Sequence, residues 1–175
     1  MNKTITIFGS SLPKEGDAEF ENAYLLGRLL AQAGFSVCTG GYRGIMHAVS
    51  KGAAENGGRA IGVTVDLWGS VPSEYLIEEV KCKTLFERIG KLVEIGDAYV
   101  VLRGGTGTLL ELAVVWEFMN KNLLVKKPVI CHSDMWKSIT EIMEAQIRHE
   151  GRETGIVKHS DSIKEIADYI IESLS

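Results

Sequence analysis

A glycine-rich turn near the middle of the chain carries the strongest chemical signal in the sequence. It follows a short apolar run and precedes a helix pattern, and it consists of Gly104, Gly105, Thr106, Gly107 and Thr108. Glycines allow a ligand to approach the backbone without meeting a Cβ atom, and the N-terminus of a helix favours a phosphate. The pattern therefore predicts a nucleotide phosphate site, with a ligand-free tight turn as the alternative.

Three charged side chains stand close to this turn in the sequence or in the preceding helix pattern. Glu111 falls in what we expect to be the first helical turn, where the helix dipole stabilises a carboxylate by about 0.5 kcal/mol. A negative charge beside a phosphate also suggests a functional role, so we expect Glu111 to face the sugar side of a bound nucleotide. Arg88 is either solvated or functional, and Arg103 contacts either phosphate or solvent; the spacing alone leaves both open.

Other nucleotide and metal motifs are not matched. The turn lacks the Lys-Ser/Thr pair of a Walker A loop. The second predicted strand ends in Thr39-Gly40-Gly41, where a dinucleotide fingerprint has an acid for the ribose. The four histidines, at positions 47, 132, 149 and 159, have no metal-ligand spacing. The sequence therefore predicts no NAD site, no metal site and no other cofactor.

The elements that position these residues follow from the alternation of short apolar runs with amphipathic segments. Strands are expected at Thr4–Phe8, Phe35–Thr39, Ala60–Val65, Glu79–Lys83, Ala98–Leu102 and Pro128–Cys131. Helices are expected at Asp17–Ala33, Gly44–Glu55, Leu85–Ile95, Gly107–Asn120, Asp134–His149 and Ser162–Ser173. This order predicts a single Rossmann-like α/β domain over residues 1–175, with a mostly parallel sheet and helices on both of its faces.

Three of the predicted strands end in glycine-rich turns, at Gly9–Ser11, Gly40–Gly44 and Gly104–Thr108. The carboxyl ends of parallel strands lie at one edge of the sheet, and ligands bind outside that edge. We therefore expect the three turns to converge, and Ser10 and Gly41 join the five turn residues as predicted substrate-binding positions.

Composition limits the partners. The net charge of −4 and the pI of about 5.6 argue against binding along a nucleic-acid backbone. No stretch approaches the ~20 apolar residues of a membrane span, and no secretory signal is visible. The three cysteines lack a CxxC spacing, so we expect buried thiols in a cytoplasmic protein. The helix at Gly107–Asn120 is apolar on most sides, which predicts burial, in part against a second subunit.

The segment from Glu87 to Glu111 resembles the LOG ("lonely guy") family. Members of that family carry the motif PGGxGTxxE, which the residues up to Glu111 resemble, and an arginine on a helix upstream of it, which corresponds to Arg88. The Gly40–Met46 turn is similar to the family's GGxxGLM element. The resemblance implies a Rossmann-like homodimer or larger oligomer. It also implies hydrolysis of nucleoside 5′-monophosphates such as AMP to a free base and ribose 5-phosphate, with Arg88 and Glu111 as the catalytic pair.

The chain departs from the family motif at two positions. Arg103 replaces the motif's proline, and Ile89 replaces the lysine of an Arg-Lys pair. Members that activate cytokinins usually keep both, which speaks against a cytokinin substrate. A protein of the same fold that carries a nucleotide or a molybdenum cofactor without cleaving it is the alternative function; binding of single-stranded DNA is disfavoured by the net charge.

Overall fold

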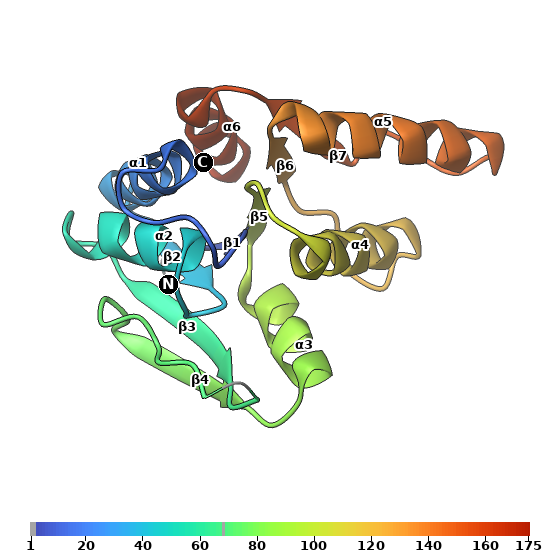
Figure 1. The fold of residues 1–175 in the computed structure, drawn as a ribbon. Coiled ribbons are helices and arrows are strands. Elements are labelled where there is room, and N and C mark those ends of the chain that lie inside the picture. The colour runs from blue at the N-terminus through green and yellow to red at the C-terminus, as the bar shows by residue number, and fades with distance from the viewer. Residues whose placement is uncertain (1–2, 68) are drawn as a thin grey trace.

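The computed structural model describes residues 3–67 and 69–175, which form one α/β domain (Figure 1). Its strands are β1 (Thr4–Phe8), β2 (Ser36–Thr39), β3 (Ala60–Val65), β4 (Glu78–Cys82), β5 (Ala98–Val101), β6 (Val129–His132) and β7 (Val157–Ser160). Its helices are α1 (Ala18–Gln32), α2 (Ile45–Ala54), α3 (Leu85–Ile95), α4 (Thr106–Asn120), α5 (Asp134–His149) and α6 (Ile163–Leu174).

The sheet is parallel throughout, with the strand order β4-β3-β2-β1-β5-β6-β7. The chain moves outward from β1 to β4, returns to pair β5 with the other side of β1, and then moves outward again to β7. The direction of winding thus reverses between β1 and β5. A crevice opens at the carboxyl ends of the strands at such a reversal, and ligands of open α/β sheets bind there.

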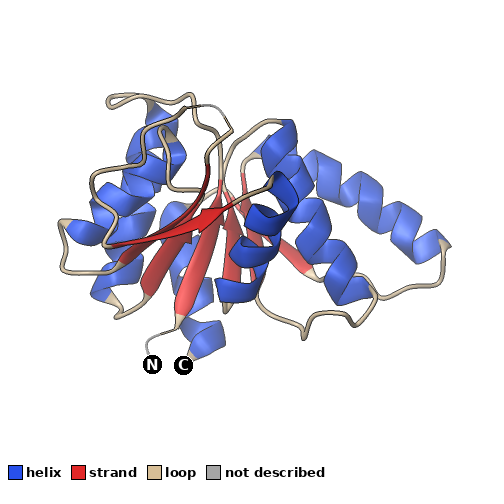
Figure 2. Ribbon diagram, turned by 90° about the horizontal axis from the view of Figure 1, so that it is seen from below, coloured by secondary structure: helices blue, strands red, loops and turns tan. Residues whose placement is uncertain are grey.

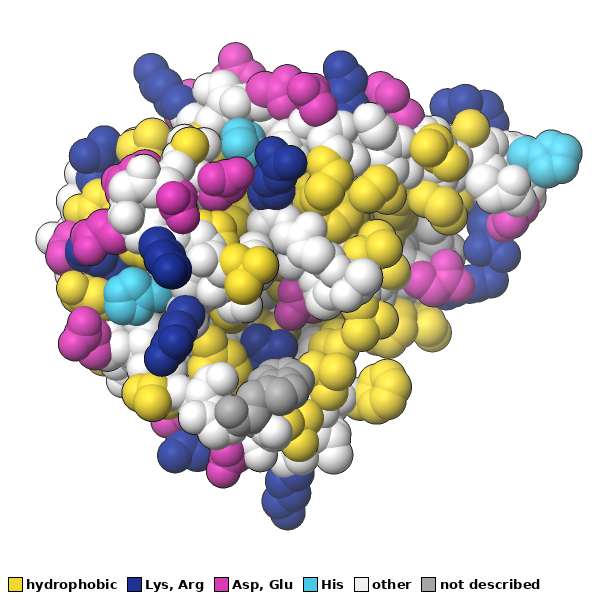
Figure 3. All heavy atoms as spheres, viewed as in Figure 1, with side chains coloured by type: hydrophobic (Ala, Val, Ile, Leu, Met, Phe, Trp, Pro, Cys, Tyr) yellow, Lys and Arg dark blue, Asp and Glu magenta, His cyan; other side chains and the backbone are white. Residues whose placement is uncertain are grey.

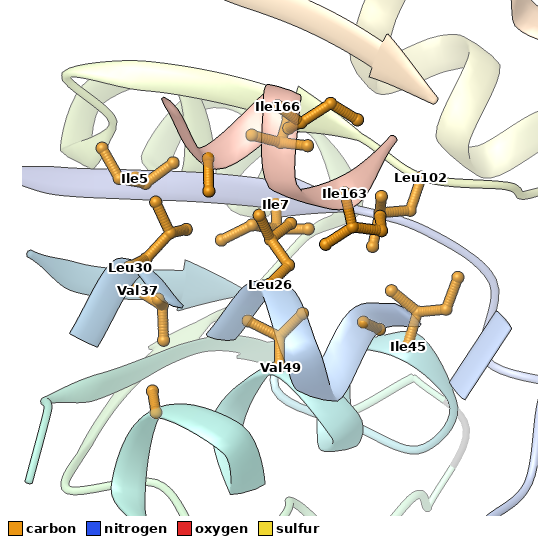
Figure 4. Packing of buried hydrophobic residues seen from close by; sticks show 14 of the residues in the cluster. Ile5, Ile7, Leu26, Leu30, Val37, Ile45, Val49, Leu102, Ile163 and Ile166 are labelled. Carbon is orange, nitrogen blue, oxygen red and sulfur yellow. The ribbon is translucent and has the colours of Figure 1, made fainter. Parts of the chain in front are cut away.

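Helices cover both faces of the sheet (Figure 2). One core lies between the sheet and helices α1, α2 and α6, where Ile5 and Ile7 of β1 meet Leu26 of α1, Val49 of α2 and Ile166 of α6 (Figure 4). The other core lies between the sheet and α3, α4 and α5. The central strands read as continuous apolar runs because both of their faces are covered.

The predicted Rossmann-like α/β domain is confirmed, and most predicted elements agree with the structure to within two residues. The expected burial of the thiols is also confirmed, since Cys38, Cys82 and Cys131 are all free and buried. Strand β7 was not predicted. Its sequence, Val157-Lys158-His159-Ser160, has no apolar run because it forms an edge of the sheet and is only partly buried.

Helix α4 is only partly buried in the single chain, and the expectation that part of its burial is against a second subunit stays a prediction. Its side chains Leu109, Leu110 and Phe118 are 40%, 39% and 38% exposed. An apolar groove of about 480 Å³ lies between α4 and α5, and apolar side chains gather over these helices in Figure 3. Trp116 lines the groove, and its buried Nε1 has no hydrogen-bond acceptor in the part of the chain that the structure describes. None of the helices in the described ranges is long and apolar enough to cross a membrane.

Candidate functional site

The loops that follow β1, β2 and β5 are joined at the carboxyl edge of the sheet by backbone hydrogen bonds. The N–H of Ser10 donates to the carbonyl of Arg103 at 3.0 Å, and the N–H of Ile45 donates to the carbonyl of Ser10 at 2.8 Å. The predicted convergence of the three glycine-rich turns is therefore confirmed. The β1 loop lies in the middle, in contact with both of the others.

These loops surround a cleft of about 550 Å³, which is visible as a hollow with acidic and basic side chains inside it (Figure 3). The cleft brings together seven of the nine predicted site residues: Ser10, Arg88, Gly105, Thr106, Gly107, Thr108 and Glu111. It is further lined by residues that were not predicted as site residues: Ile7, Phe8, Gly9, Ser11, Leu12, Gly40, Tyr42, Met46 and Ser70.

The other two predicted residues, Gly41 and Gly104, do not line this cleft. Gly41 has a φ of +78° and packs against Thr64, so its position requires glycine for reasons of backbone geometry. A Cβ atom on Gly104 would lie 2.1 Å from the Oγ1 of Thr108, which makes a side chain there incompatible with the turn. Both glycines shape the loops around the cleft.

The first turn of α4 opens into the cleft. Gly105 occupies the N-cap position, and none of the described side chains caps the helix there. The first N–H groups of an α-helix have no acceptor within the helix, and together with the dipole they form a site for an anion. A Cβ atom on Gly105 or Gly107 would meet no atom of the described residues within 4 Å. The fold itself does not require glycine at these two positions, whereas close approach of a ligand would.

Arg88 is buried at the floor of the cleft. Its Nε donates to the carbonyl of Val63 at 2.8 Å, and its Nη2 donates to the carbonyl of Gly40 at 3.2 Å. Its Nη1 lies 3.6 Å from the Oε1 of Glu111. Of the two alternatives left open by the sequence, the solvated side chain is wrong: the guanidinium is held on three sides by the protein.

The turn after β2 is built around this guanidinium, and the sequence analysis missed its contribution. A Cβ atom on Gly40 would lie 1.7 Å from the Nη2 of Arg88, so only glycine leaves room for the arginine. The ring of Tyr42 lies with its centroid 5.9 Å from the guanidinium carbon, within range of a cation–π contact. The Gly40–Met46 element was the available signal, but it did not reveal which glycine faces Arg88.

Glu111 is 9% exposed and lies in the second turn of α4. The expectation that it falls in the first helical turn is wrong, so dipole stabilisation at the helix start does not explain a carboxylate here. Burial raises the pKa of Glu111 to about 7, and the positive charge of Arg88 only partly opposes that rise. The carboxyl group can therefore gain or lose a proton near neutral pH, as acid–base catalysis requires.

Arg103 lies at the rim of the cleft. Its side chain is 60% exposed, and its Nη1 is 3.9 Å from the Oε1 of Glu19 on α1. Arg103 and Glu19 line a second hollow, of about 400 Å³, that adjoins the cleft at Ser10 and Gly105. Within the described ranges, no cluster of three or more His, Cys, Asp or Glu side chains is arranged to bind a metal ion.

A model of the SLOG cluster4 family matches residues 2–166. The chain belongs to this family. The resemblance to the LOG family, drawn from the segment that ends at Glu111, is thereby confirmed. A curated relative, the cytokinin riboside 5′-monophosphate phosphoribohydrolase of Rhodococcoides fascians, is 28% identical over an alignment of 138 residues that covers 75% of this chain and 68% of the relative.

Solved structures with the same fold include proteins named for the molybdenum cofactor. The molybdenum cofactor binding protein of Rippkaea orientalis is 24% identical and superimposes with a TM-score of 0.80, covering 100% of this chain and 99% of that one. The molybdenum cofactor carrier protein of Chlamydomonas reinhardtii is 22% identical, with a TM-score of 0.79 and 99% coverage of both chains. At these identities the similarity establishes the fold of the chain.

Proposed function

We propose that the protein is a nucleoside 5′-monophosphate phosphoribohydrolase. The observation that carries the proposal is the buried pair of Arg88 and Glu111, 3.6 Å apart, at the floor of the cleft into which the first turn of α4 opens. A helix N-terminus that suits a phosphate and a carboxyl group with a pKa raised to about 7 thus line one cavity, which supports the proposal. The name of the relative from Rhodococcoides fascians supports the same reaction.

In this proposal the 5′-phosphate binds to the first turn of α4. The N–H groups of Gly105–Thr108 donate to the phosphate oxygens, and the hydroxyls of Thr106 and Ser10 add further donors at the same edge of the cleft. Glu111 lies one helical turn further along α4. A nucleotide anchored by its phosphate therefore has its ribose beside the carboxyl group.

Cleavage of the N-glycosidic bond passes through an oxocarbenium-like state, as in other glycoside hydrolysis. The Glu111 carboxylate stabilises the positive charge on the ribose and orients the attacking water. The water oxygen bonds to C1′, the bond from C1′ to the base breaks, and a proton passes to the departing base. Arg88, fixed by the carbonyls of Val63 and Gly40, holds the carboxylate in place.

The test is a panel of nucleoside 5′-monophosphates, AMP among them, incubated with the purified protein and analysed by chromatography for free base and ribose 5-phosphate. We expect release of a base from at least one nucleotide, with one ribose 5-phosphate formed for each base. A protein that binds nucleotides tightly, or retains a molybdenum cofactor through purification, and releases no base would be a carrier, and the enzymatic proposal would be abandoned.

We further propose that the protein acts in the cytoplasm as a homodimer or larger homo-oligomer that pairs through the groove between α4 and α5. The apolar side chains that line and flank the groove support burial against another protein. Its edge carries both Glu117 and Arg152, 3.9 Å apart, so two copies related by a two-fold axis can exchange this ion pair. The three free thiols fit a reducing compartment.

Assembly is tested by light scattering on the wild-type protein and on Leu110→Glu, which places a charge among the exposed side chains of α4. The proposal expects a wild-type mass of at least twice that of the chain and a smaller mass for the variant. Phe86→Glu, at an 84% exposed position on α3, is the control and should assemble as the wild type does. A wild-type monomer would contradict the proposed assembly.

A further inference from the structure

The buried ion pair at the floor of the cleft is not in direct hydrogen-bonding contact. The Nη1 of Arg88 and the Oε1 of Glu111 are 3.6 Å apart, whereas a hydrogen bond between a guanidinium and a carboxylate is about 2.7–2.9 Å long. In a buried site opposite charges attract more strongly than in water, so closing this gap would be favourable. Contacts on the other side of the guanidinium must therefore oppose the closure.

Three groups hold the guanidinium on the side of β2 and β3. The carbonyls of Val63 and Gly40 accept from its Nε and Nη2 at 2.8 and 3.2 Å. The third group is the ring of Tyr42, whose centroid lies 5.9 Å from the guanidinium carbon. A cation–π contact is stronger when its partners are withdrawn from water, and here both residues are buried. The carbonyls are present in every variant, whereas a substitution can remove the ring.

The ring of Tyr42 is itself fixed in place. Its hydroxyl accepts a hydrogen bond from the backbone N–H of Val65 at 2.8 Å and donates one to the carbonyl of the same residue. Val65 and Val63, which binds the arginine, both lie near the end of β3. Tyr42 and Arg88 are therefore tied to the same strand, and the ring cannot follow the guanidinium towards the carboxyl group.

The charge that acts on Glu111 comes from Arg88, which opposes the effect of burial on the pKa of the carboxyl group. The guanidinium also acts on the thiols of Cys38 and Cys82, but burial raises the pKa of Cys38 to about 12 and that of Cys82 above its usual value, so both are uncharged at neutral pH. Other charged side chains act on these thiols and not on Glu111: Glu78, Glu87 and Lys91. Among the described residues, the position of Arg88 therefore controls how readily Glu111 ionises.

We infer that Tyr42 is a positioning residue, whose fixed ring holds the Arg88 guanidinium back from a direct hydrogen bond to Glu111. With that hydrogen bond, Glu111 would be an ordinary ionised carboxylate and a weaker base, and its negative charge would stabilise a ribose cation less. Tyr42 stands at an unspecified position of the GGxxGLM element, so the family motif does not assign it this role. Its part in catalysis rests on the proposed function, whereas its hold on Arg88 does not.

The test is a titration of Glu111 followed by NMR, in protein with isotope-labelled glutamate carboxyl carbons and without substrate. The resonance that is absent from Glu111→Gln identifies the residue. We expect a midpoint of about 7 in the wild type and a midpoint about one pH unit lower in Tyr42→Leu, because the guanidinium then moves closer to the carboxylate. Tyr42→Phe keeps the ring but loses its ties to Val65, so its midpoint should lie between these two.

Tyr99→Phe is the matched control, because Tyr99 is also buried and donates from its hydroxyl to backbone carbonyls, those of Val93 and Gly96. Its midpoint should equal that of the wild type. Unchanged midpoints in both Tyr42 variants, a raised midpoint in either, or an equal shift in Tyr99→Phe would overturn the inference. Because the titration uses no substrate, its result is separate from that of the nucleotide panel, which tests the proposed function.

Discussion

Two Arg–Glu pairs mark the floor and the rim of the same cleft, and their environments differ in almost every respect. At the floor, Arg88 and Glu111 are both buried, and the arginine is held by two carbonyl groups. At the rim, the side chains of Arg103 and Glu19 are 60% and 40% exposed, and they lie 3.9 Å apart. Removal from water makes a buried charge costly and strongly coupled to its partner. The proposed chemistry therefore belongs to the floor, whereas the rim pair is a long surface contact.

The largest expected difference between the two regions is in stability. Arg88→Met leaves the carbonyls of Val63 and Gly40 without a donor and Glu111 without a cation, and breaking a buried pair in this way costs about 3 kcal/mol. Arg103→Gln should change the free energy of unfolding by less than about 0.5 kcal/mol. Urea denaturation of both variants measures these values. Equal, small effects would mean that the floor pair is not structurally distinct from the rim pair.

The second prediction concerns the pH dependence of stability. The pKa of Glu111 is raised from 4.5 in the unfolded chain to about 7 in the fold. Its protonated form therefore stabilises the fold, and this stability is lost as pH rises from 4.5 through 7. Glu111→Gln does not titrate, so the difference in stability between this variant and the wild type should shift in favour of the variant by up to about 3 kcal/mol between pH 5 and pH 8.

Thermal unfolding across this pH range tests the second prediction, with Arg103→Gln as the control at the rim. This variant keeps Glu111, so its stability should follow the same pH dependence as that of the wild type. A constant difference between Glu111→Gln and the wild type from pH 5 to pH 8 would contradict the raised pKa.

The third prediction concerns the rate. If the Glu111 carboxylate stabilises the cationic transition state, kcat/KM for base release should rise about tenfold per pH unit below pH 7 and level off above it. The rate of base release by the wild type, measured across this pH range with dilute nucleotide, gives kcat/KM, and the same series with saturating nucleotide gives kcat. A rate that falls as pH rises through 7 would show that the protonated acid is the active form, and the assigned role of Glu111 would be wrong.

The smallest effects are expected within the glycine turn that connects floor and rim. Gly107→Ala should leave stability unchanged or raise it by up to about 1 kcal/mol, because alanine is the better helix former and its Cβ meets no described atom within 4 Å. Nucleotide affinity should nevertheless fall. Gly104→Ala should destabilise the fold by about 1–3 kcal/mol through its clash with Thr108. The opposite order of stabilities would contradict the division of the turn into fold-shaping and ligand-facing glycines.

The sequence predicted the fold well because its central strands are unambiguous apolar runs that end in glycine. The edge strand β7 was missed because it contains Lys158 and His159 and has no such run. The convergence of the three loops followed from the parallel sheet alone. In contrast, neither the burial of Arg88 nor the role of Gly40 was predictable, because both depend on contacts between α3 and the turn after β2 that no local pattern records.

The burial of Glu111 was likewise not predictable from the sequence. Helix α4 begins at Thr106, so Glu111 lies in its second turn, and its raised pKa comes from burial, which spacing along the chain does not show. The sequence identified the residue through the motif, and the structure supplies the physical reason. Its carboxyl group is placed where water is largely excluded and a cation is close.

The central claim is that Glu111 performs chemistry on a nucleotide that the rest of the cleft binds. The most direct test measures binding and cleavage of the best nucleoside 5′-monophosphate side by side in the wild type and in Glu111→Gln. We predict that the variant binds the nucleotide at least as tightly and releases base at least about a hundredfold more slowly. Base release by the variant at the wild-type rate would contradict the account.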